Sequence, residues 1–310
     1  MSEEQPYPIG TPGVPWSDAE RQQWLDKQTV KRSYSDEVLT TIARLESRFD
    51  VVQYGALAID PRRYPLMALH TKKWRDDLPV ALVTGGVHGY ETSGVQGALR
   101  FADTEAERYV DRFNLLVAPC VSPWGYETIN RWNPRALDPN RSFFPDSPSE
   151  EAAALMSYLQ SLNVKPIVHL DLHETTDTDN SEFRPALSAR DAKQQKNWHI
   201  PDGFYTVGDS EKPTPGFQKA IVDAVKAVTH IAPVDPEGTI IGSEVQQEGV
   251  IHYAAAALGL CMGTTDAPYV TTTEVYPDSP SVDDENCTQA QVAAVLGGLE
   301  YMRRSDSRNE

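Results

Sequence analysis

Cysteine is scarce in this sequence of 310 residues. Only Cys120, Cys261 and Cys287 occur, and they are widely spaced. Their odd number and the lack of a CxxC pair argue against both a disulfide framework and a cysteine-based metal site. We therefore expect all three to be buried as small apolar side chains, with Cys120 at the end of a strand near the functional site.

Long apolar runs and a surplus of basic residues are also missing. No stretch approaches the roughly 18 apolar residues that a membrane-spanning helix needs. The start of the chain, MSEEQPYPIG, lacks the basic and apolar regions of a secretory signal, so we expect a cytoplasmic protein. Asp and Glu outnumber Lys and Arg by 45 to 28, which gives a formal net charge of -17. This charge argues against nucleic acid or membrane lipid as a partner and favours a small molecule or a peptide.

The first 35 residues differ in composition from the rest. They are rich in proline and polar residues and show no sustained periodicity, which predicts an extended arm on the surface. We expect residues 36 to 310 to form a single domain, because one large core is compatible with this length. The sequence leaves the oligomeric state open.

Strand and helix patterns alternate through this domain. Apolar runs bounded by turn residues predict strands near 51–59, 66–71, 80–86, 115–121, 166–173, 204–209 and 271–276. Helical spacing predicts helices near 35–49, 92–108, 149–162, 215–229 and 284–303. The first three strands fit either a meander or two strands beside a buried central one. The whole pattern predicts an α/β fold, with a central mixed sheet flanked by helices.

One long segment does not fit this alternation. The residues from Thr175 to Asp202 are polar and weakly periodic, which predicts a loop. Loops of that length in a compact domain are usually functional or mobile. We expect this one to form a wall of the functional site.

Metal ligands are indicated where two predicted strands end. The segment TGGVHGYETSG places His88 in a loop after a buried strand and Glu91 at the start of a helix. The segment PIVHLDLHETT ends a second strand, whose alternation puts His169, Asp171 and His173 on one face. Because open α/β sheets bind ligands at the carboxyl ends of their strands, His173 is the expected third ligand. Two imidazoles and a carboxylate leave one position open, as catalytic zinc requires.

The other histidines are less suited to metal binding. His169 lies deeper in the strand, and we expect an ordinary buried histidine bonded to a neighbour. His70, His199, His230 and His252 have no context that suggests metal binding.

The middle of the chain resembles the zinc carboxypeptidase family, the carboxypeptidase A-like metallohydrolases. The segment RWNPRALDPNRSF is similar to the family pattern RxNxxGxDxNRxF without a gap, and Ala136 replaces the glycine. The positions that match are Arg131, Asn133, Asp138, Asn140, Arg141 and Phe143. The HxxE motif before this segment and His173 after it stand in the order that the family uses.

This resemblance implies a role for each matching residue. His88, Glu91 and His173 would hold one Zn²⁺ per chain, and Asp138 would orient His88. Arg131 would stabilise the oxyanion of the reaction, while Asn140 and Arg141 would bind a free carboxylate of the substrate.

The later motifs are weaker. The segment DLHETT is closer to the succinylglutamate desuccinylase and aspartoacylase branch than to the digestive enzymes. The segment TTTEVYP resembles the strand that carries the family's catalytic glutamate, which implies that Glu274 has this role. Neither Tyr253 nor Tyr269 aligns with the mobile tyrosine of the digestive enzymes. The resemblance covers about residues 50 to 300 and leaves the first 35 residues outside.

Three functions are compatible with these motifs. The preferred hypothesis is a zinc metallocarboxypeptidase that hydrolyses the amide bond next to the free C-terminal carboxylate of a peptide. The alternative is an N-acyl amino acid amidohydrolase of the desuccinylase or aspartoacylase kind. The third is an inactive zinc-containing module that binds peptides, against which the retention of Glu274 argues.

Overall fold

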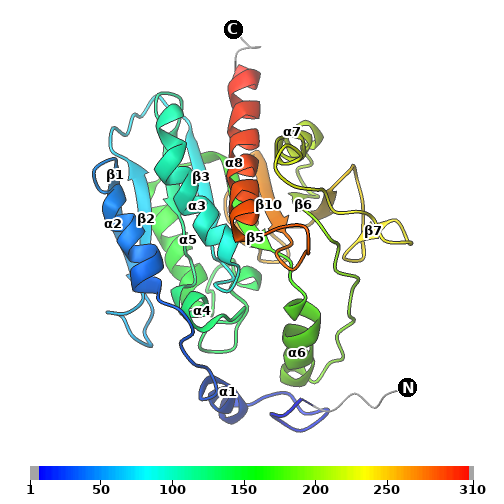
Figure 1. The fold of residues 1–310 in the computed structure, drawn as a ribbon. Helices are drawn as coiled ribbons and strands as arrows, with labels where there is room; N and C mark the ends of the chain where they lie inside the picture. The colour runs from blue at the N-terminus through cyan, green and yellow to red at the C-terminus, as the bar shows by residue number, and fades with distance from the viewer. Residues whose placement is uncertain (1–6, 307–310) are drawn as a thin grey trace.

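The computed structural model describes residues 7–306. Within them, eight strands form one sheet in the order β1-β2-β4-β3-β5-β10-β6-β9 (Figure 1). These strands are β1 (Phe49–Ala56), β2 (Pro65–Thr71), β3 (Val80–Gly85), β4 (Asn114–Ala118), β5 (Pro166–Glu174), β6 (Tyr205–Asp209), β9 (Val250–Tyr253) and β10 (Tyr269–Val275). Two short strands, β7 (Thr239–Ile240) and β8 (Ser243–Glu244), form a separate hairpin.

The helices cover both faces of the sheet. They are α1 (Asp18–Leu25), α2 (Thr40–Leu45), α3 (Thr92–Thr104), α4 (Pro123–Thr128), α5 (Glu150–Leu162), α6 (Arg184–Asp191), α7 (Pro215–Val225) and α8 (Asp284–Asp306). A π-helical turn, Ser35–Leu39, leads into α2. No helix among residues 7–306 is long and apolar enough to cross a membrane.

The sheet is mixed, as expected from the sequence. Strands β4, β3, β5 and β10 run parallel, whereas β2 is antiparallel to β4 and β6 is antiparallel to β10. The possible meander of the first three strands is wrong, because β4 lies between β2 and β3. Instead, β1 and β2 form an antiparallel pair beside the buried parallel centre.

The central strand β3 is apolar on both faces because helices cover both. On β3, Ala81 and Val83 belong to the core with α2, α3, α7 and α8, whereas Leu82 packs in the core with α5. This explains why β3 reads as a continuous apolar run in the sequence. The arrangement is a single α/β domain, which confirms the predicted fold class.

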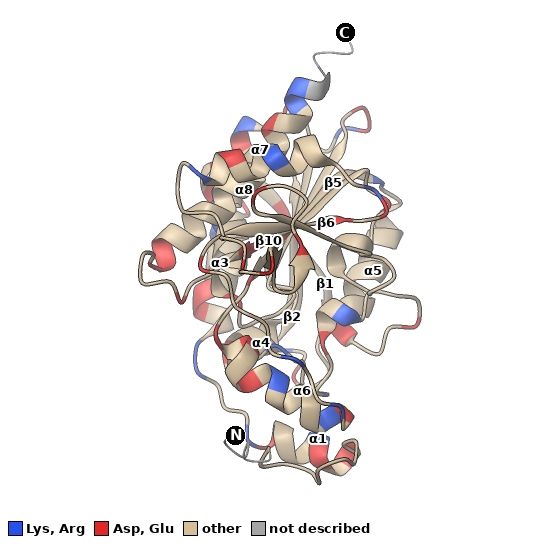
Figure 2. Cartoon of the chain, turned by 90° about the vertical axis from the view of Figure 1, so that its right-hand side faces the viewer, with Lys and Arg blue, Asp and Glu red and all other residues tan. Residues whose placement is uncertain are grey.

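The prediction of an extended N-terminal arm is wrong in part, because the arm contains α1. Ser17 and Glu20 form a capping box at its start, a pattern present in the sequence as S-x-x-E. Trp16 and Trp24 are buried in the main core, and the Trp16 amide donates to the carbonyl of Arg190 at 2.8 Å. Figures 1 and 2 show α1 lying beside α6. Residues 1–6 of the predicted arm and 307–310 of the predicted domain lie outside the described residues.

The segment predicted as a loop from Thr175 to Asp202 is also wrong in its first half. A π-helical turn, Asp179–Phe183, continues into α6, and residues 175–177 and 192–202 lack regular structure. Pro185 lies in the first turn of α6, directly after the π-helical turn. Ala186 is buried, and Phe183 and Leu187 pack against the core, so tertiary contacts stabilise a helix with weak periodicity of its own.

Two glycines bring α3 close to the sheet. A Cβ atom on Gly94 would lie 2.3 Å from the carbonyl oxygen of Leu172 on β5, and one on Gly85 would lie 2.4 Å from the carbonyl oxygen of Gly94. Neither position therefore accepts a side chain without backbone movement. This close approach carries the first turn of α3 to the ends of β3 and β5.

We predict that Gly94→Ala lowers the free energy of unfolding by about 2 kcal/mol or more, because the backbone of β5 must move. The measurement is urea unfolding of the chelator-treated protein. Gly216→Ala in α7 is the control, since the three atoms nearest to its Cβ would all belong to the Tyr301 side chain, the closest at 3.0 Å. Equal stabilities of the two variants would contradict the proposed close packing.

Candidate active site

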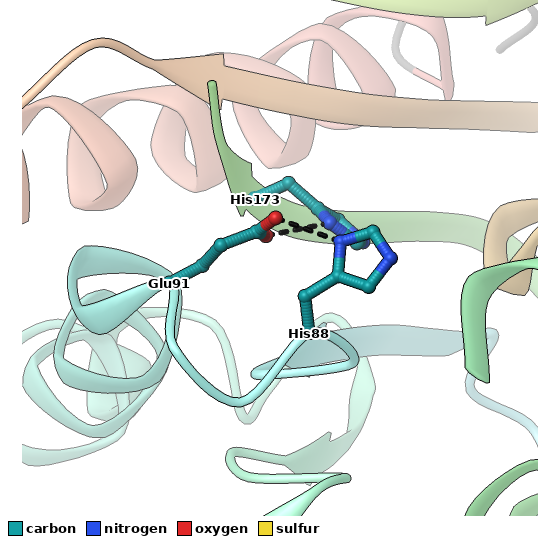
Figure 3. A group of neighbouring side chains, drawn as sticks. All are labelled: His88, Glu91 and His173. Carbon is teal, nitrogen blue, oxygen red and sulfur yellow. Dashed lines mark hydrogen bonds and ion pairs between the residues drawn. The ribbon is translucent and has the colours of Figure 1, made fainter. Parts of the chain in front are cut away.

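The three residues predicted as metal ligands lie together (Figure 3). His88 lies in the loop after β3, Glu91 at the N-cap of α3 and His173 near the end of β5. All three are buried, and one ligand atom from each lies within 4.8 Å of the others. The Nδ1 atoms of His88 and His173 each lie 2.7 Å from a different oxygen of Glu91.

Strand register explains why these residues meet. Gly85, the last residue of β3, pairs with Leu172, the residue before His173. Gly86 then turns the chain with a φ of 60°, and the Glu91 amide donates to the His88 carbonyl at 3.2 Å. The HxxE loop and the end of β5 are thus level at the carboxyl edge of the parallel strands, where α/β sheets bind ligands.

A carboxylate holds the outer nitrogen of each histidine. The Nε2 atom of His88 lies 2.9 Å from Asp138, and that of His173 lies 2.9 Å from Asp171. These contacts orient each ring so that Nδ1 faces Glu91, as carboxylate partners of metal-bound histidines do. Asp138 was expected in this role. Asp171 was not assigned one, although its spacing of two residues from His173 on the same strand was a usable signal.

The electrostatics of this cluster favour a bound cation. Burial alone would lower the pKa of His173, but Asp171 and Glu91 raise it well above its usual range. Burial alone would raise the pKa of Glu91, but His173 and His88 lower it. Two imidazole nitrogens and a carboxylate oxygen facing one point suit a divalent metal such as zinc. The donor set therefore fits the metal that the motifs imply.

His169 lies beneath this cluster and bonds to a neighbour, as expected. Its Nε2 atom lies 2.9 Å from the Thr84 hydroxyl, which donates to Asp171 at 2.6 Å. All three cysteines are buried, also as expected. Cys120 follows the end of β4 and lies against Gly86, whereas Cys261 contacts the Thr84 hydroxyl at 3.7 Å.

Arg131 lies beside the three expected metal ligands, and its guanidinium is held in place. Its guanidinium donates to Asp138 at 3.1 Å and to Asp179 at 3.2 Å, and it lies 4.3 Å from the ring centre of Phe183. Burial alone would lower the pKa of Arg131, but Asp138 and Asp179 raise it, so the group stays charged. Asp179 was missed because it lies in the segment predicted as a loop.

Asn140 and Arg141 follow Asp138 directly and line the same space. The side-chain oxygen of Asn140 accepts from the Cys261 amide at 2.7 Å, and its amide nitrogen lies 3.5 Å from His173. Arg141 donates to the Asn140 carbonyl at 2.7 Å. Within residues 7–306, no carboxylate forms an ion pair with Arg141. This arginine is therefore able to pair with a carboxylate of a ligand.

Glu274 on β10 pairs in register with His173 on β5. The Thr175 hydroxyl donates to Glu274 at 2.9 Å and lies 2.6 Å from the Tyr205 hydroxyl. Burial raises the pKa of Glu274 above its usual range, and this effect is opposed by His173. Thr175 and Tyr205 had no signal in the sequence, because this hydrogen-bonded chain joins residues of β6 and β10 to the residue that follows β5.

The two tyrosines left open by the sequence differ in position. Tyr253, at the end of β9, lines the same cavity as Glu274 and Arg141. Tyr269 packs in the core between Phe217 and Tyr301. Of the two, only Tyr253 can contact a ligand in this cavity.

A cavity of about 590 Å³, here called the metal cavity, unites the site. The predicted residues that line it are His88, Glu91, Arg131, Asp138, Asn140, Arg141 and Glu274. The segment between Thr175 and Asp202 contributes one wall, including Phe183, Arg184 and Trp198. This agrees with the expectation that the segment borders the functional site.

Ala136, which replaces the family's glycine, keeps the backbone that glycine favours. Its φ is 53°, and its carbonyl accepts hydrogen bonds from Arg21 and Arg190. Asn133 holds the turn, because its side-chain oxygen accepts from the amides of Arg135 and Leu137. The motif therefore keeps its shape despite the substitution.

Arg32, in the N-terminal arm, contacts the HxxE loop directly. Its guanidinium donates to the Gly89 carbonyl at 3.0 Å, to the Thr92 hydroxyl at 2.6 Å and to the Tyr126 carbonyl at 2.6 Å. It also lies 3.5 Å from the ring centre of Tyr126. Gly89 lies between the two expected ligands of the HxxE motif, so the arm supports the HxxE loop. Sequence reasoning missed Arg32 because the arm lies outside the family resemblance.

Comparison with known proteins agrees with this arrangement. Residues 77–206 match the succinylglutamate desuccinylase/aspartoacylase catalytic domain. A proposed metallopeptidase from Shewanella denitrificans OS217 has a TM-score of 0.67 and 20% identity, over 89% of this chain and 96% of its own. A metallo-carboxypeptidase from Burkholderia cenocepacia has a TM-score of 0.61 and 15% identity, over 88% and 70%. No curated protein matches the sequence significantly.

The shared fold and the domain match support a metallohydrolase of the zinc carboxypeptidase type. The match of residues 77–206 is to the succinylglutamate desuccinylase and aspartoacylase branch of such enzymes. The family resemblance stated from the sequence is thereby confirmed.

We predict that the wild-type protein binds about one zinc ion per chain and that Arg32→Gln weakens zinc binding about 10-fold, because the HxxE loop loses its support. The measurement is competition with a chromophoric chelator of known zinc affinity. Arg44→Gln is the matched control, since Arg44 is exposed on α2 and, among residues 7–306, its side chain hydrogen-bonds only to Thr41. Unchanged zinc affinity in Arg32→Gln would show that the arm does not support the HxxE loop.

Proposed function

We propose that the protein is a zinc-dependent metallocarboxypeptidase, which hydrolyses the amide bond next to the free C-terminal carboxylate of a peptide. The observation that carries this proposal is the position of Arg141. It lines the metal cavity, has no carboxylate partner among residues 7–306 and follows Asp138, which contacts His88, by three residues. A substrate carboxylate at Arg141 would place the adjacent amide near the metal ligands.

The metal and Glu274 would share the activation of water. Zinc held by His88, Glu91 and His173 would supply a Lewis acid that activates a water molecule and polarises the scissile carbonyl. Glu274 would accept the proton of the attacking water and deliver it to the leaving amine. The Thr175 hydroxyl holds one oxygen of Glu274, which fixes the carboxylate for proton transfer. Burial raises the pKa of Glu274, which favours its action as a base.

Arg131 would stabilise the negative charge that develops on the carbonyl oxygen. Asp138, Asp179 and Phe183 hold its guanidinium in place before substrate binds. A cation held in position in this way stabilises the transition state without a reorganisation cost.

The second candidate is an N-acyl amino acid amidohydrolase. The match of residues 77–206 to the desuccinylase/aspartoacylase domain favours it. Both candidates use the same metal, base and carboxylate clamp, so they differ only in the acyl part of the substrate. A screen of the zinc-loaded protein against C-terminal dipeptides and N-acyl amino acids tests the proposal. Hydrolysis of neither class would overturn both candidates and favour the inactive peptide-binding module.

We predict that Glu274→Gln retains zinc but lowers kcat on the order of 100-fold or more, because the amide cannot accept the water's proton. Zinc content and steady-state kinetics on the best substrate of the screen give the two readouts. Glu244→Gln, at an exposed glutamate on β8, should leave kcat unchanged. Near-normal turnover by Glu274→Gln would remove this residue from the mechanism.

We predict that amidation of the substrate's terminal carboxylate lowers kcat/KM by a factor of at least about 30. The lost charge-assisted pair costs roughly 2 kcal/mol. Arg141→Ala should erase most of this discrimination, whereas Arg135→Ala should keep it, because Arg135 is exposed and does not line the metal cavity. Equal rates of the wild type on free and amidated forms would exclude the carboxylate clamp.

A further inference from the structure

A second cavity of about 590 Å³ adjoins the metal cavity. We call it the arm cavity, because Tyr7 and Trp24 of the N-terminal arm line it together with Glu182 and the start of α8 at Asp284. The two cavities share Arg131, Glu174 and Phe183 as lining residues. The arm lies outside the family resemblance, so this cavity is a feature of this chain and not of the motifs.

The positions of Arg141 and Arg131 indicate which part of the substrate would face the arm cavity. Arg141 lines only the metal cavity, whereas Arg131 lines both. In the proposed reaction, Arg141 holds the terminal carboxylate and Arg131 contacts the oxygen of the scissile carbonyl. The part of the substrate on the acyl side of that carbonyl therefore continues toward the arm cavity.

The lining of the arm cavity is aromatic and acidic. Five acidic residues line it, namely Glu37, Glu174, Glu182, Asp278 and Asp284, and none of them forms an ion pair with any residue between 7 and 306. Its cations are Lys31 and Arg131, and Arg131 is already paired with two aspartates. An excess of negative charge beside aromatic rings is the environment that binds ammonium groups.

A buried hydrogen-bond donor in the wall of the arm cavity points to an occupant that also carries a hydrogen-bond acceptor. Trp132 lines the arm cavity and is 2% exposed, and its indole Nε1 has no hydrogen-bond partner among the described residues. Because buried donors are normally satisfied, this indole is a candidate donor to an acceptor on the occupant. A peptide provides such an acceptor in each of its carbonyl groups.

We propose that the arm cavity binds the acyl side of a peptide substrate whose residue before the scissile bond carries an ammonium group. This group is either a lysine side chain or the free α-amino group of a dipeptide. The proposal rests on the function proposed above and specifies its substrate class. An anionic acyl group such as succinyl would meet the same carboxylates and bind poorly.

The test compares four substrates that share the C-terminal residue cleaved fastest in the screen, written X. Acetyl-norleucyl-X is neutral, acetyl-lysyl-X has a side-chain ammonium, norleucyl-X has a free α-amino group, and succinyl-norleucyl-X has an added carboxylate. For the zinc-loaded wild type, kcat/KM on at least one of the two ammonium substrates should exceed that on acetyl-norleucyl-X by about 5-fold or more. The succinyl substrate should be slowest, and added salt should reduce all these differences.

A double variant, Glu182→Gln with Asp284→Asn, tests whether the cavity causes the preference. Both residues are exposed, and neither side chain forms a hydrogen bond or ion pair with a residue between 7 and 306, so the fold should tolerate the change. The preference for ammonium, taken as the ratio of kcat/KM to that on acetyl-norleucyl-X, should fall to about 2-fold or less. Glu107→Gln with Asp111→Asn removes the same charge after α3, away from both cavities, and should keep the preference.

The outcomes separate this inference from the function on which it rests. Cleavage of acetyl-norleucyl-X with no preference for either ammonium substrate would overturn the role of the arm cavity and leave the carboxypeptidase intact. An equal loss of preference in the control variant would also overturn it, since overall charge would then be the cause. Cleavage of none of the four substrates would refute the proposed function itself. If the double variant fails to fold, Glu182→Gln alone should show a partial loss of the preference.

Discussion

The carboxylate of Asp138 is the interaction on which the rest of the site depends. One oxygen accepts from His88 at 2.9 Å and from the Asn140 amide at 2.9 Å, and the other accepts from Arg131 at 3.1 Å. A single buried side chain thus orients a metal ligand, holds the expected oxyanion cation and sets the start of the turn that presents Arg141. Burial alone would raise the pKa of Asp138, but Arg131 and His88 lower it well below its usual range.

Such a concentration of buried charge is stable only when each group has a partner. An ionised carboxylate without one would lose several kcal/mol of hydration free energy. Here the charges alternate from Asp179 through Arg131, Asp138 and His88 to Glu91. His173 and Asp171 continue the series on β5. The two histidines face Glu91 with their Nδ1 atoms, so a divalent cation can replace contacts within the cluster without new unpaired groups.

The N-terminal arm and the segment after β5 supply contacts that hold the motif residues in place. Arg32 of the arm supports the HxxE loop, and Asp179 of the following segment fixes Arg131. Neither was predictable from spacing, because each acts on a motif far away in the chain. The helices within these segments were missed for related reasons. The S-x-x-E signal of α1 stands in a proline-rich context, and α6 depends on contacts of Phe183 and Leu187 with the core.

Local sequence patterns alone were sufficient to predict the positions of several site residues. Strand alternation placed His173 and Asp171 on one face, the buried run of β3 set the position of His88, and short spacing joined Asp138 to Arg141. These inferences succeed because the backbone geometry of a strand or turn fixes the relative directions of nearby side chains. Only the tertiary structure decided that Thr175 and Tyr205 hold Glu274, that Arg32 reaches Gly89, and that Tyr253 and not Tyr269 faces the cavity. Strand order and helix packing set these contacts, and both depend on how the whole core is filled, which no local pattern encodes.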